Sequence, residues 1–155
     1  GSEYYDIAHQ SLVADYIIIM SYDEHYAGSK EAGSVSSMTF TEKAVNDAIA
    51  LTGDASRVIN GMPFYTRAWI TTPATDGKKG EGVYVEDATN GNYYLSSQAI
   101  TMDKAKELYT NAKVKPTFDE TTGQNFVSYE KGDSTVSIWL EDATSVKSRL
   151  DIMEK

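Results

Sequence analysis

An unbroken apolar run from Tyr16 to Met20 is the clearest hydrophobic feature of the chain. The run is rich in β-branched residues and too short for a helix, which predicts a strand buried on both faces, as in a parallel sheet. Polar and aromatic residues follow at once, from Ser21 to Tyr26. Because ligands of parallel α/β proteins bind at the carboxyl ends of the strands, this stretch is a candidate site. A buried strand that leads into an ordinary solvated loop is the alternative interpretation.

The pattern on either side of this strand predicts a βαβ unit. A short helix or turn is expected before it, over residues 3–13. After it, Thr39 precedes Glu42 by three residues, which predicts the N-cap of a helix that ends at Gly53. The apolar positions of 57–65 predict the second strand of the unit.

The chain changes character after Ile70. An irregular loop rich in Thr, Pro and Gly is expected over 71–82, followed by one or two short strands within 82–95. Thr101 is the expected N-cap of a further helix. Turns then separate three strand candidates, which predicts an antiparallel meander. These candidates are 113–118, 125–129 and 135–140.

The last predicted helix begins at Asp142 or Thr144 and is expected to bury Val146, Leu150 and Met153. It runs to the end of the sequence without a stop signal, which indicates a chain that is cut rather than finished. A two-stranded parallel unit cannot bury both of its faces alone. The sequence therefore predicts a piece of a larger fold.

Composition narrows the function classes. With 155 residues, 41% hydrophobic and 24% charged, the chain is predicted to be globular. A formal net charge of -9 without a Lys/Arg cluster argues against nucleic-acid binding. No apolar run approaches the length of a membrane span. The 11 tyrosines and 2 tryptophans are compatible with a sugar-binding cleft, but also with an ordinary core or interface.

Three motifs carry a family resemblance. Met20-Ser21-Tyr22-Asp23 resembles the sixth-strand Met-x-Tyr-Asp motif of glycoside hydrolase family 18, the chitinase-like (β/α)8 barrels. Gly61 to Trp69 is similar to that family's seventh strand, Gly-x-Pro-x-Tyr-Gly-Arg-x-Trp, with Thr66 in place of the second glycine. Trp139-Leu140-Glu141-Asp142 resembles the exit from the family's insertion domain. The continuation Glu24-His25 most resembles the spore-coat and cortex-lytic branch.

The resemblance implies a fold class and three parts. The fold would be α/β with an α+β insertion: a segment of a (β/α)8 TIM barrel plus an antiparallel chitinase insertion domain. Residues 1–69 would form barrel strand 6, helix 6 and strand 7. Residues 70–140 would form the insertion domain, and residues 141–155 barrel helix 7.

The resemblance also implies an activity. Family members are retaining glycosidases that hydrolyse β-1,4 N-acetylglucosamine linkages of chitin or peptidoglycan, with the substrate's own acetamido group as nucleophile. Their fourth-strand signature, Asp-x-x-Asp-x-Asp-x-Glu, ends in the general acid and is missing from this chain. We therefore expect the parent protein to be a hydrolase and this chain alone to be inactive.

The family's functional residues are carried over position by position. Tyr22 and Asp23 would have supporting catalytic roles, because a phenol can donate to the acetamido oxygen and a carboxylate can stabilise developing positive charge. No metal and no cofactor is expected. The expected substrate contacts are Met20, Glu24, Tyr65, Arg67, Trp69 and Glu141. Two of these have alternative roles: Glu141 in serving a helix dipole and Trp69 in the core.

A second function class stays open. The chain could belong to a non-catalytic glycan-binding protein, a chitinase-like lectin or pseudoenzyme, or to an interaction module. The expected partner is an N-acetylglucosamine-containing polysaccharide, and the resemblance implies an extracellular, cell-wall or spore-associated bacterial location. Exposed strand edges also predict self-association.

Overall fold

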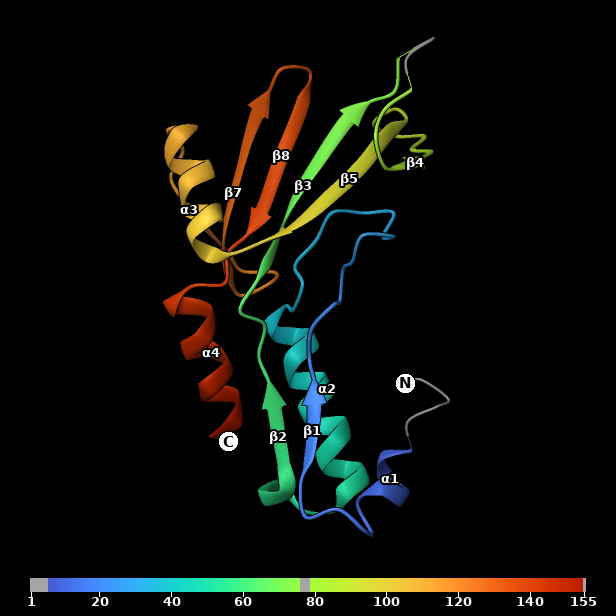
Figure 1. Cartoon of the computed structure of the whole chain (residues 1–155), viewed down its shortest axis with the longest axis vertical. Coiled ribbons are helices and arrows are strands. Elements are labelled where there is room, and N and C mark those ends of the chain that lie inside the picture. The colour runs from blue at the N-terminus through green and yellow to red at the C-terminus, as the bar shows by residue number, and fades with distance from the viewer. Residues whose placement is uncertain (1–5, 76–78, 155) are drawn as a thin grey trace.

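A parallel strand pair and a six-stranded antiparallel sheet lie end to end along the long axis of the molecule (Figure 1). The computed structural model describes residues 6–75 and 79–154. Residues 3–5 of the first predicted helix lie outside this range, as do 76–78 of the predicted loop.

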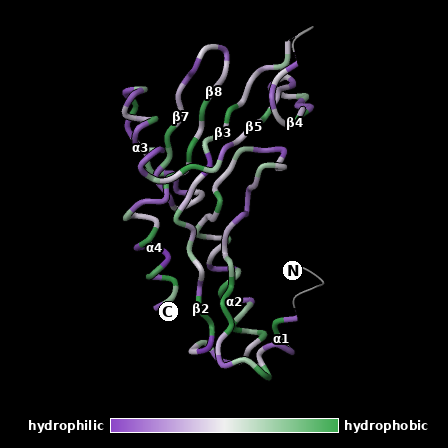
Figure 2. Tube along the Cα trace, viewed as in Figure 1, coloured by the Kyte–Doolittle hydropathy of each residue, from purple (hydrophilic) through white to green (hydrophobic). Residues whose placement is uncertain are grey.

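The parallel pair consists of β1 (Ile17–Met20) and β2 (Val58–Gly61), in register from Ile17 opposite Val58 to Met20 opposite Gly61. The helix α2 (Met38–Thr52) connects them and packs on one face, which confirms the βαβ unit. Figure 2 shows apolar residues gathered along this unit. The remaining elements here are the short helices α1 (Ile7–Gln10) and η1 (Ala55–Arg57).

The prediction that β1 is buried on both faces is wrong for this chain. Ile17 and Ile19 pack against α2, whereas Ile18 is 66% exposed and Met20 is 64% exposed. A helix covers only one face of a strand pair, and side chains alternate between the faces. Only one face of this apolar strand is therefore buried.

The start of α2 also differs from the prediction. Ser37, and not Thr39, is the N-cap, and its Oγ accepts a hydrogen bond from the Phe40 backbone N–H at 3.2 Å. Thr39 lies inside the first turn and is exposed. The predicted stop at Gly53 is confirmed, since this glycine has a φ of 71°.

Replacing Ser37 with alanine is expected to destabilise the fold by about 0.5–2 kcal/mol, because the Phe40 backbone N–H loses its acceptor and the Glu24 carboxylate loses a donor. Thr39→Ala is the matched control, with an expected effect within about 0.5 kcal/mol. Urea unfolding of both variants measures the difference. A larger loss for Thr39→Ala would contradict the assignment of the cap.

The second predicted strand is shorter than expected. β2 ends at Gly61, and the next strand, β3 (Thr66–Pro73), belongs to the antiparallel sheet. Residues up to Pro73 that were predicted as irregular loop are therefore strand. The expected boundary between residues 69 and 70 falls inside β3, because its pairing with β5 already begins at Thr66.

The antiparallel sheet has the strand order β4-β5-β3-β8-β7-β6, which confirms the meander of the last three strands. One face packs on α3 (Met102–Asn111), which Thr101 caps as predicted. The core between them contains Val127, Val136 and Ile138. The other strands are β4 (Val83–Val85), β5 (Tyr93–Ile100), β6 (Thr117–Asp119), β7 (Gln124–Lys131) and β8 (Ser134–Trp139).

The last helix, α4 (Ala143–Met153), runs back beside the parallel unit (Figure 1). Asp142 caps it in a capping box with Ser145, which confirms one of the two predicted starts. The predicted buried face is wrong, because Leu150 is 47% exposed whereas Ser145 and Arg149 are buried. The helix packs through a polar contact that hydrophobic periodicity does not reveal.

Candidate functional site

The end of β1 turns sharply at the candidate site. Asp23 has a φ of 61°, in the left-handed region that residues with a side chain rarely adopt. Aspartate is among the residue types that tolerate it best, and such strained positions gather at functional sites. The turn leaves Asp23 exposed and Tyr22 half-buried.

Two of the predicted motifs meet here. The Tyr65 hydroxyl donates a hydrogen bond to Asp23 Oδ1, across 42 positions of sequence. The rings of Tyr22 and Tyr65 form an edge-to-face pair with centroids 6.3 Å apart and planes at 83°. The structure thus brings together residues that sequence reasoning connected only through separate motifs.

Burial raises the pKa of Tyr65 above its usual value, and the hydrogen bond to Asp23 and that residue's negative charge add to the effect. The phenol therefore stays protonated and serves as a donor throughout the physiological pH range. Arg67 opposes the shift without cancelling it.

This shift predicts a loss of stability at alkaline pH. Above about pH 10 the unfolded chain releases the phenol proton that the folded chain retains, so the free energy of unfolding falls as pH rises. Tyr65→Phe is expected to make that fall shallower, measured by urea unfolding between pH 8 and 11. Tyr16→Phe, at an exposed phenol, is the control. Equal pH slopes for wild type and Tyr65→Phe would contradict the shift.

Arg67 extends from β3 toward the same region. Its Nη1 donates to Ser97 Oγ at 3.0 Å. Its Nε is buried and has no hydrogen-bond partner within residues 6–75 and 79–154. The guanidinium is therefore held on the sheet by Ser97, and its Nε is closed off from solvent.

Glu24 and His25 support the loop behind the strand end. The Glu24 carboxylate accepts from the Ser37 backbone N–H at 2.7 Å and from Ser37 Oγ at 3.1 Å. His25 Nδ1 donates to the Ser34 carbonyl at 2.8 Å. A Cβ at Gly33 would lie 2.4 Å from the imidazole, so this position requires glycine for close packing. Glu24 and His25 also line a cavity of about 540 Å³, which Trp139 lines as well.

Two predicted substrate contacts are buried. Trp69 is 1% exposed, and its Nε1 donates to the Gly33 carbonyl at 2.8 Å. Glu141 is 4% exposed, and Arg149, Gln124 and Ser145 occupy both of its carboxylate oxygens. Burial tends to raise the pKa of Glu141, and Arg149 opposes this. Both side chains are therefore enclosed in the fold and do not lie on an exposed surface.

Sequence reasoning missed the serine segment Ser34–Ser37 and the residues Gln124 and Arg149, which join Glu141 to that segment. No spacing signal marks them, because the hydrogen bonds that define their roles cross 90 and 113 positions. Within residues 6–75 and 79–154, no three His, Asp or Glu side chains come together as a metal site. None of the helices there has the length and apolar character needed to cross a membrane.

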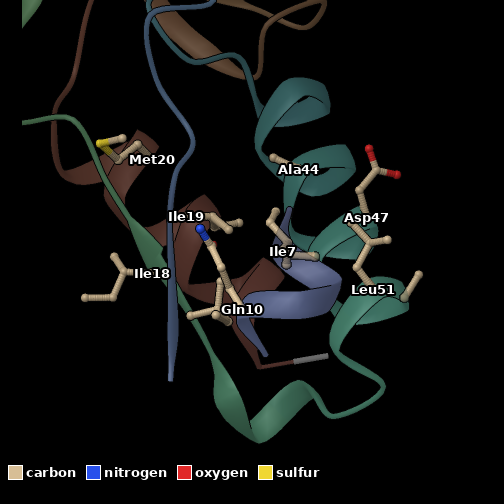
Figure 3. Close-up of a pocket in the computed structure, with 11 residues that line it drawn as sticks. Ile7, Gln10, Ile18, Ile19, Met20, Ala44, Asp47 and Leu51 are labelled. Atoms are coloured by element: carbon tan, nitrogen blue, oxygen red, sulfur yellow. The ribbon is translucent and has the colours of Figure 1, made fainter. Parts of the chain in front are cut away.

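An apolar groove of about 730 Å³ lies where α1, β1 and α2 meet, and Met20 is among its lining residues (Figure 3). Figure 3 shows Ile7 and Ile19 between β1 and α2, whereas Ile18 and Met20 point away from α2. Met20 is thus on the open face of the strand pair, close in sequence to Tyr22 and Asp23.

The parallel unit, the antiparallel sheet and the strand-end residues together define a chitinase-like α/β domain. The chain belongs to the glycosyl hydrolases family 18, whose family model matches residues 1–155. The family expected from the motifs is thereby confirmed.

Individual relatives agree with this assignment. The chain is 26% identical over 146 residues to the "Uncharacterized glycosylase YvbX" of Bacillus subtilis (strain 168), covering 94% of this chain and 36% of the relative. The C-terminal domain of a candidate chitinase from Desulfitobacterium hafniense DCB-2 matches with a TM-score of 0.76 and 26% identity, over 97% of this chain and 41% of that one. The spore cortex-lytic enzyme SleL of Bacillus megaterium QM B1551 shares the fold, with a TM-score of 0.73 and 22% identity, over 97% and 30%. The chain therefore spans less than half the length of each.

Proposed function

We propose that this chain is part of a retaining, substrate-assisted glycosidase that hydrolyses β-1,4 N-acetylglucosamine linkages. The observation that carries the proposal is the hydrogen bond from Tyr65 to Asp23, which joins the two motifs at one strand-end site. Arg67, half-buried on β3 with its Nη1 on Ser97 Oγ, would add a guanidinium donor for a sugar oxygen. Family membership supports a glycoside hydrolase parent.

The residue types suit the reaction. In the proposed mechanism the acetamido oxygen of the sugar attacks its anomeric carbon while a general acid protonates the leaving oxygen, whose bond to that carbon breaks. Water then opens the resulting oxazolinium ion and restores the acetamido group. Tyr22 would donate a hydrogen bond to the acetamido group. Asp23, whose Oδ1 accepts from Tyr65, would use Oδ2 to accept from a sugar hydroxyl or to stabilise the positive charge. Met20 would form an apolar floor under the sugar.

The remaining expected contacts have different roles in this proposal. Glu24 would lie at the rim of the cleft, held by Ser37. Trp69 and Glu141 would act indirectly, since both are buried. The general acid would come from outside these residues, because the family's acidic signature is missing from the sequence. The isolated chain is therefore proposed to be inactive.

The open face of the strand pair supports a partial (β/α)8 barrel. Ile18, Met20 and Ile59 are exposed on β1 and β2, where further parallel strands would cover them. The chain spans 36% and 41% of the length of two of its relatives. In the proposed parent, residues 1–69 supply barrel strands 6 and 7, 70–140 the insertion domain, and 141–155 barrel helix 7.

Within the family, we place the parent in the spore-coat and cortex-lytic branch, with peptidoglycan or chitin as substrate. The Tyr22-Asp23-Glu24-His25 sequence and the fold shared with a spore cortex-lytic enzyme support this. The proposed location is extracellular, at the cell wall or the spore.

Hydrolysis of a chromogenic N-acetylglucosamine oligomer tests the proposal, with the full-length parent beside this chain. We expect turnover by the parent and none by the chain. In the parent, Tyr22→Phe is expected to lower kcat by about 10²–10³, because one donor to the reacting group is removed. Tyr16→Phe, at an exposed position directly before β1, is the control. Binding without cleavage by the parent would favour the lectin-like alternative, and turnover by the chain alone would contradict the absence of the acid.

The open strand edges carry a separate prediction. Among residues 6–75 and 79–154, β1 and β2 pair only with each other. The open face of this strand pair, with Ile18, Met20 and Ile59, is apolar. We expect the isolated chain to self-associate as its concentration rises. Light scattering over a concentration series measures this, and Ile18→Lys should weaken it. A monomer at every concentration would contradict the prediction.

A further inference from the structure

A buried polar network joins α4 to the antiparallel sheet. Arg149 is 0% exposed and donates through Nη1 and Nη2 to the Glu141 carboxylate, with Nη2 2.8 Å from Oε1. The same carboxylate accepts from Gln124 Nε2 at 2.8 Å and from Ser145 Oγ at 2.8 Å. Four hydrogen bonds therefore fix the carboxylate, and the carboxylate in turn fixes the guanidinium.

The network reaches the serine segment that follows the candidate site. Arg149 Nη2 also donates to the Ser36 carbonyl, and Ser36 Oγ donates to the Ser21 carbonyl. On the sheet side, Ser34 Oγ donates to Gln124 Oε1. The segment is thus held by α4 and by β7 at once. The residues that make these contacts, Ser34, Ser36, Gln124 and Arg149, are all buried.

The same segment holds the backbone of the site on its other side. The Glu24 backbone N–H donates to the Val35 carbonyl at 2.9 Å, and the Ser37 N–H donates to the Glu24 carboxylate at 2.7 Å. Tyr22 and Asp23 lie between these contacts of Glu24 and the hydrogen bond from Ser36 Oγ to the Ser21 carbonyl. Their backbone is therefore fixed from both ends by residues outside the site.

We propose that Arg149, anchored by Glu141, is a positioning residue that sets the backbone of Tyr22 and Asp23 through the segment Ser34–Ser37. Asp23 keeps a φ of 61°, a strained conformation that persists where the surrounding structure over-determines it. A guanidinium suits this role because its planar fork of donors serves a carboxylate and a carbonyl simultaneously. The clamp itself stands on these contacts, and its consequence for glycan binding rests on the proposed function.

Amide hydrogen exchange in this chain, measured by NMR, tests the clamp. The reporters are the amides of Glu24 and Ser37, and the reference is the Ala105 amide in α3, which donates to Thr101 at 3.0 Å. Arg149→Lys keeps the charge but cannot reproduce the fork. We expect exchange at the reporters to rise about tenfold relative to the reference, since a charged hydrogen bond is lost.

Two further variants make the test decisive. Ser36→Ala removes the hydroxyl contact to the strand end and leaves the Arg149 to Glu141 pair intact, and we expect the same local rise. Lys147→Gln, in an exposed pair on the same helix, should change nothing. Equal changes at reporters and reference, or none at the reporters, would show a purely structural role and overturn the inference. If Arg149→Lys does not fold, Ser36→Ala decides.

Titration with tri-N-acetylchitotriose separates this inference from the proposed function. Wild-type binding that weakens in Arg149→Lys and Ser36→Ala, but not in Lys147→Gln, supports both. If the sugar binds to no variant and not to wild type, the glycan proposal fails for the chain, while the exchange data still decide the clamp. Unaltered sugar binding in clamp variants with raised exchange would overturn the link between the clamp and the glycan.

Discussion

Trp69→Ala is expected to lower the free energy of unfolding by about 3–5 kcal/mol. The indole is 1% exposed, and its removal leaves a cavity between β3 and the loop that carries Gly33. It also leaves the Gly33 carbonyl without its donor at 2.8 Å. Since domains are stable by only about 5–15 kcal/mol, this single change removes a large share of the total.

Urea unfolding followed by circular dichroism measures this effect. Trp69→Phe should recover part of the loss, because the ring fills much of the space but donates no hydrogen bond. Trp139→Ala is the matched control, at a half-buried indole with its Nε1 2.9 Å from Asp119 Oδ2, and a smaller loss is expected there. A loss below that of the control would show that Trp69 is not a main packing residue.

Glu141→Ala is expected to destabilise the chain by about 3–5 kcal/mol, because it leaves the Arg149 guanidinium buried without its counter-charge. Arg149→Ala should have a loss of the same order. The double variant should lose less than the sum of the two, since each single change already breaks the pair.

A double-mutant cycle from urea unfolding measures this coupling. The double variant is still expected to be less stable than wild type, because Gln124 and Ser145 lose their acceptor when Glu141 is removed. Lys147→Ala is the control on the same helix, and the solvent-screened pair that it breaks should contribute little to stability. Additive losses in the cycle would contradict a coupled buried pair.

The elements that were predicted well are those with a local signal. α3 begins after Thr101, and α2 ends at Gly53, as their capping chemistry requires. The meander of β6, β7 and β8 follows from turns between short strands, and its order in the sheet is the order of the sequence. In each case the determining contacts lie within a few residues.

The elements that were predicted poorly depend on distant partners. Ser37 caps α2, and the Glu24 carboxylate holds it in place. The capping-box spacing in the sequence cannot show this contact, and it predicts Thr39 as the cap instead. The buried face of α4 carries Ser145 and Arg149. Hydrophobic periodicity instead predicts Leu150 on that face, and Leu150 is exposed. A polar contact inside a fold has no hydrophobic pattern, and its partner can lie anywhere in the chain.

The sequence by itself determined the family, the βαβ unit, the antiparallel meander and the two motifs of the candidate site. Only the tertiary structure decided that Tyr65 meets Asp23, that Trp69 and Glu141 are buried, and that Arg149 reaches the serine segment. The physical reason is range. Capping, turns and side-chain periodicity are properties of neighbouring residues. The hydrogen bonds from Trp69 to Gly33, from Tyr65 to Asp23 and from Arg149 to Ser36 cross 36, 42 and 113 positions, and they exist only once the chain has folded.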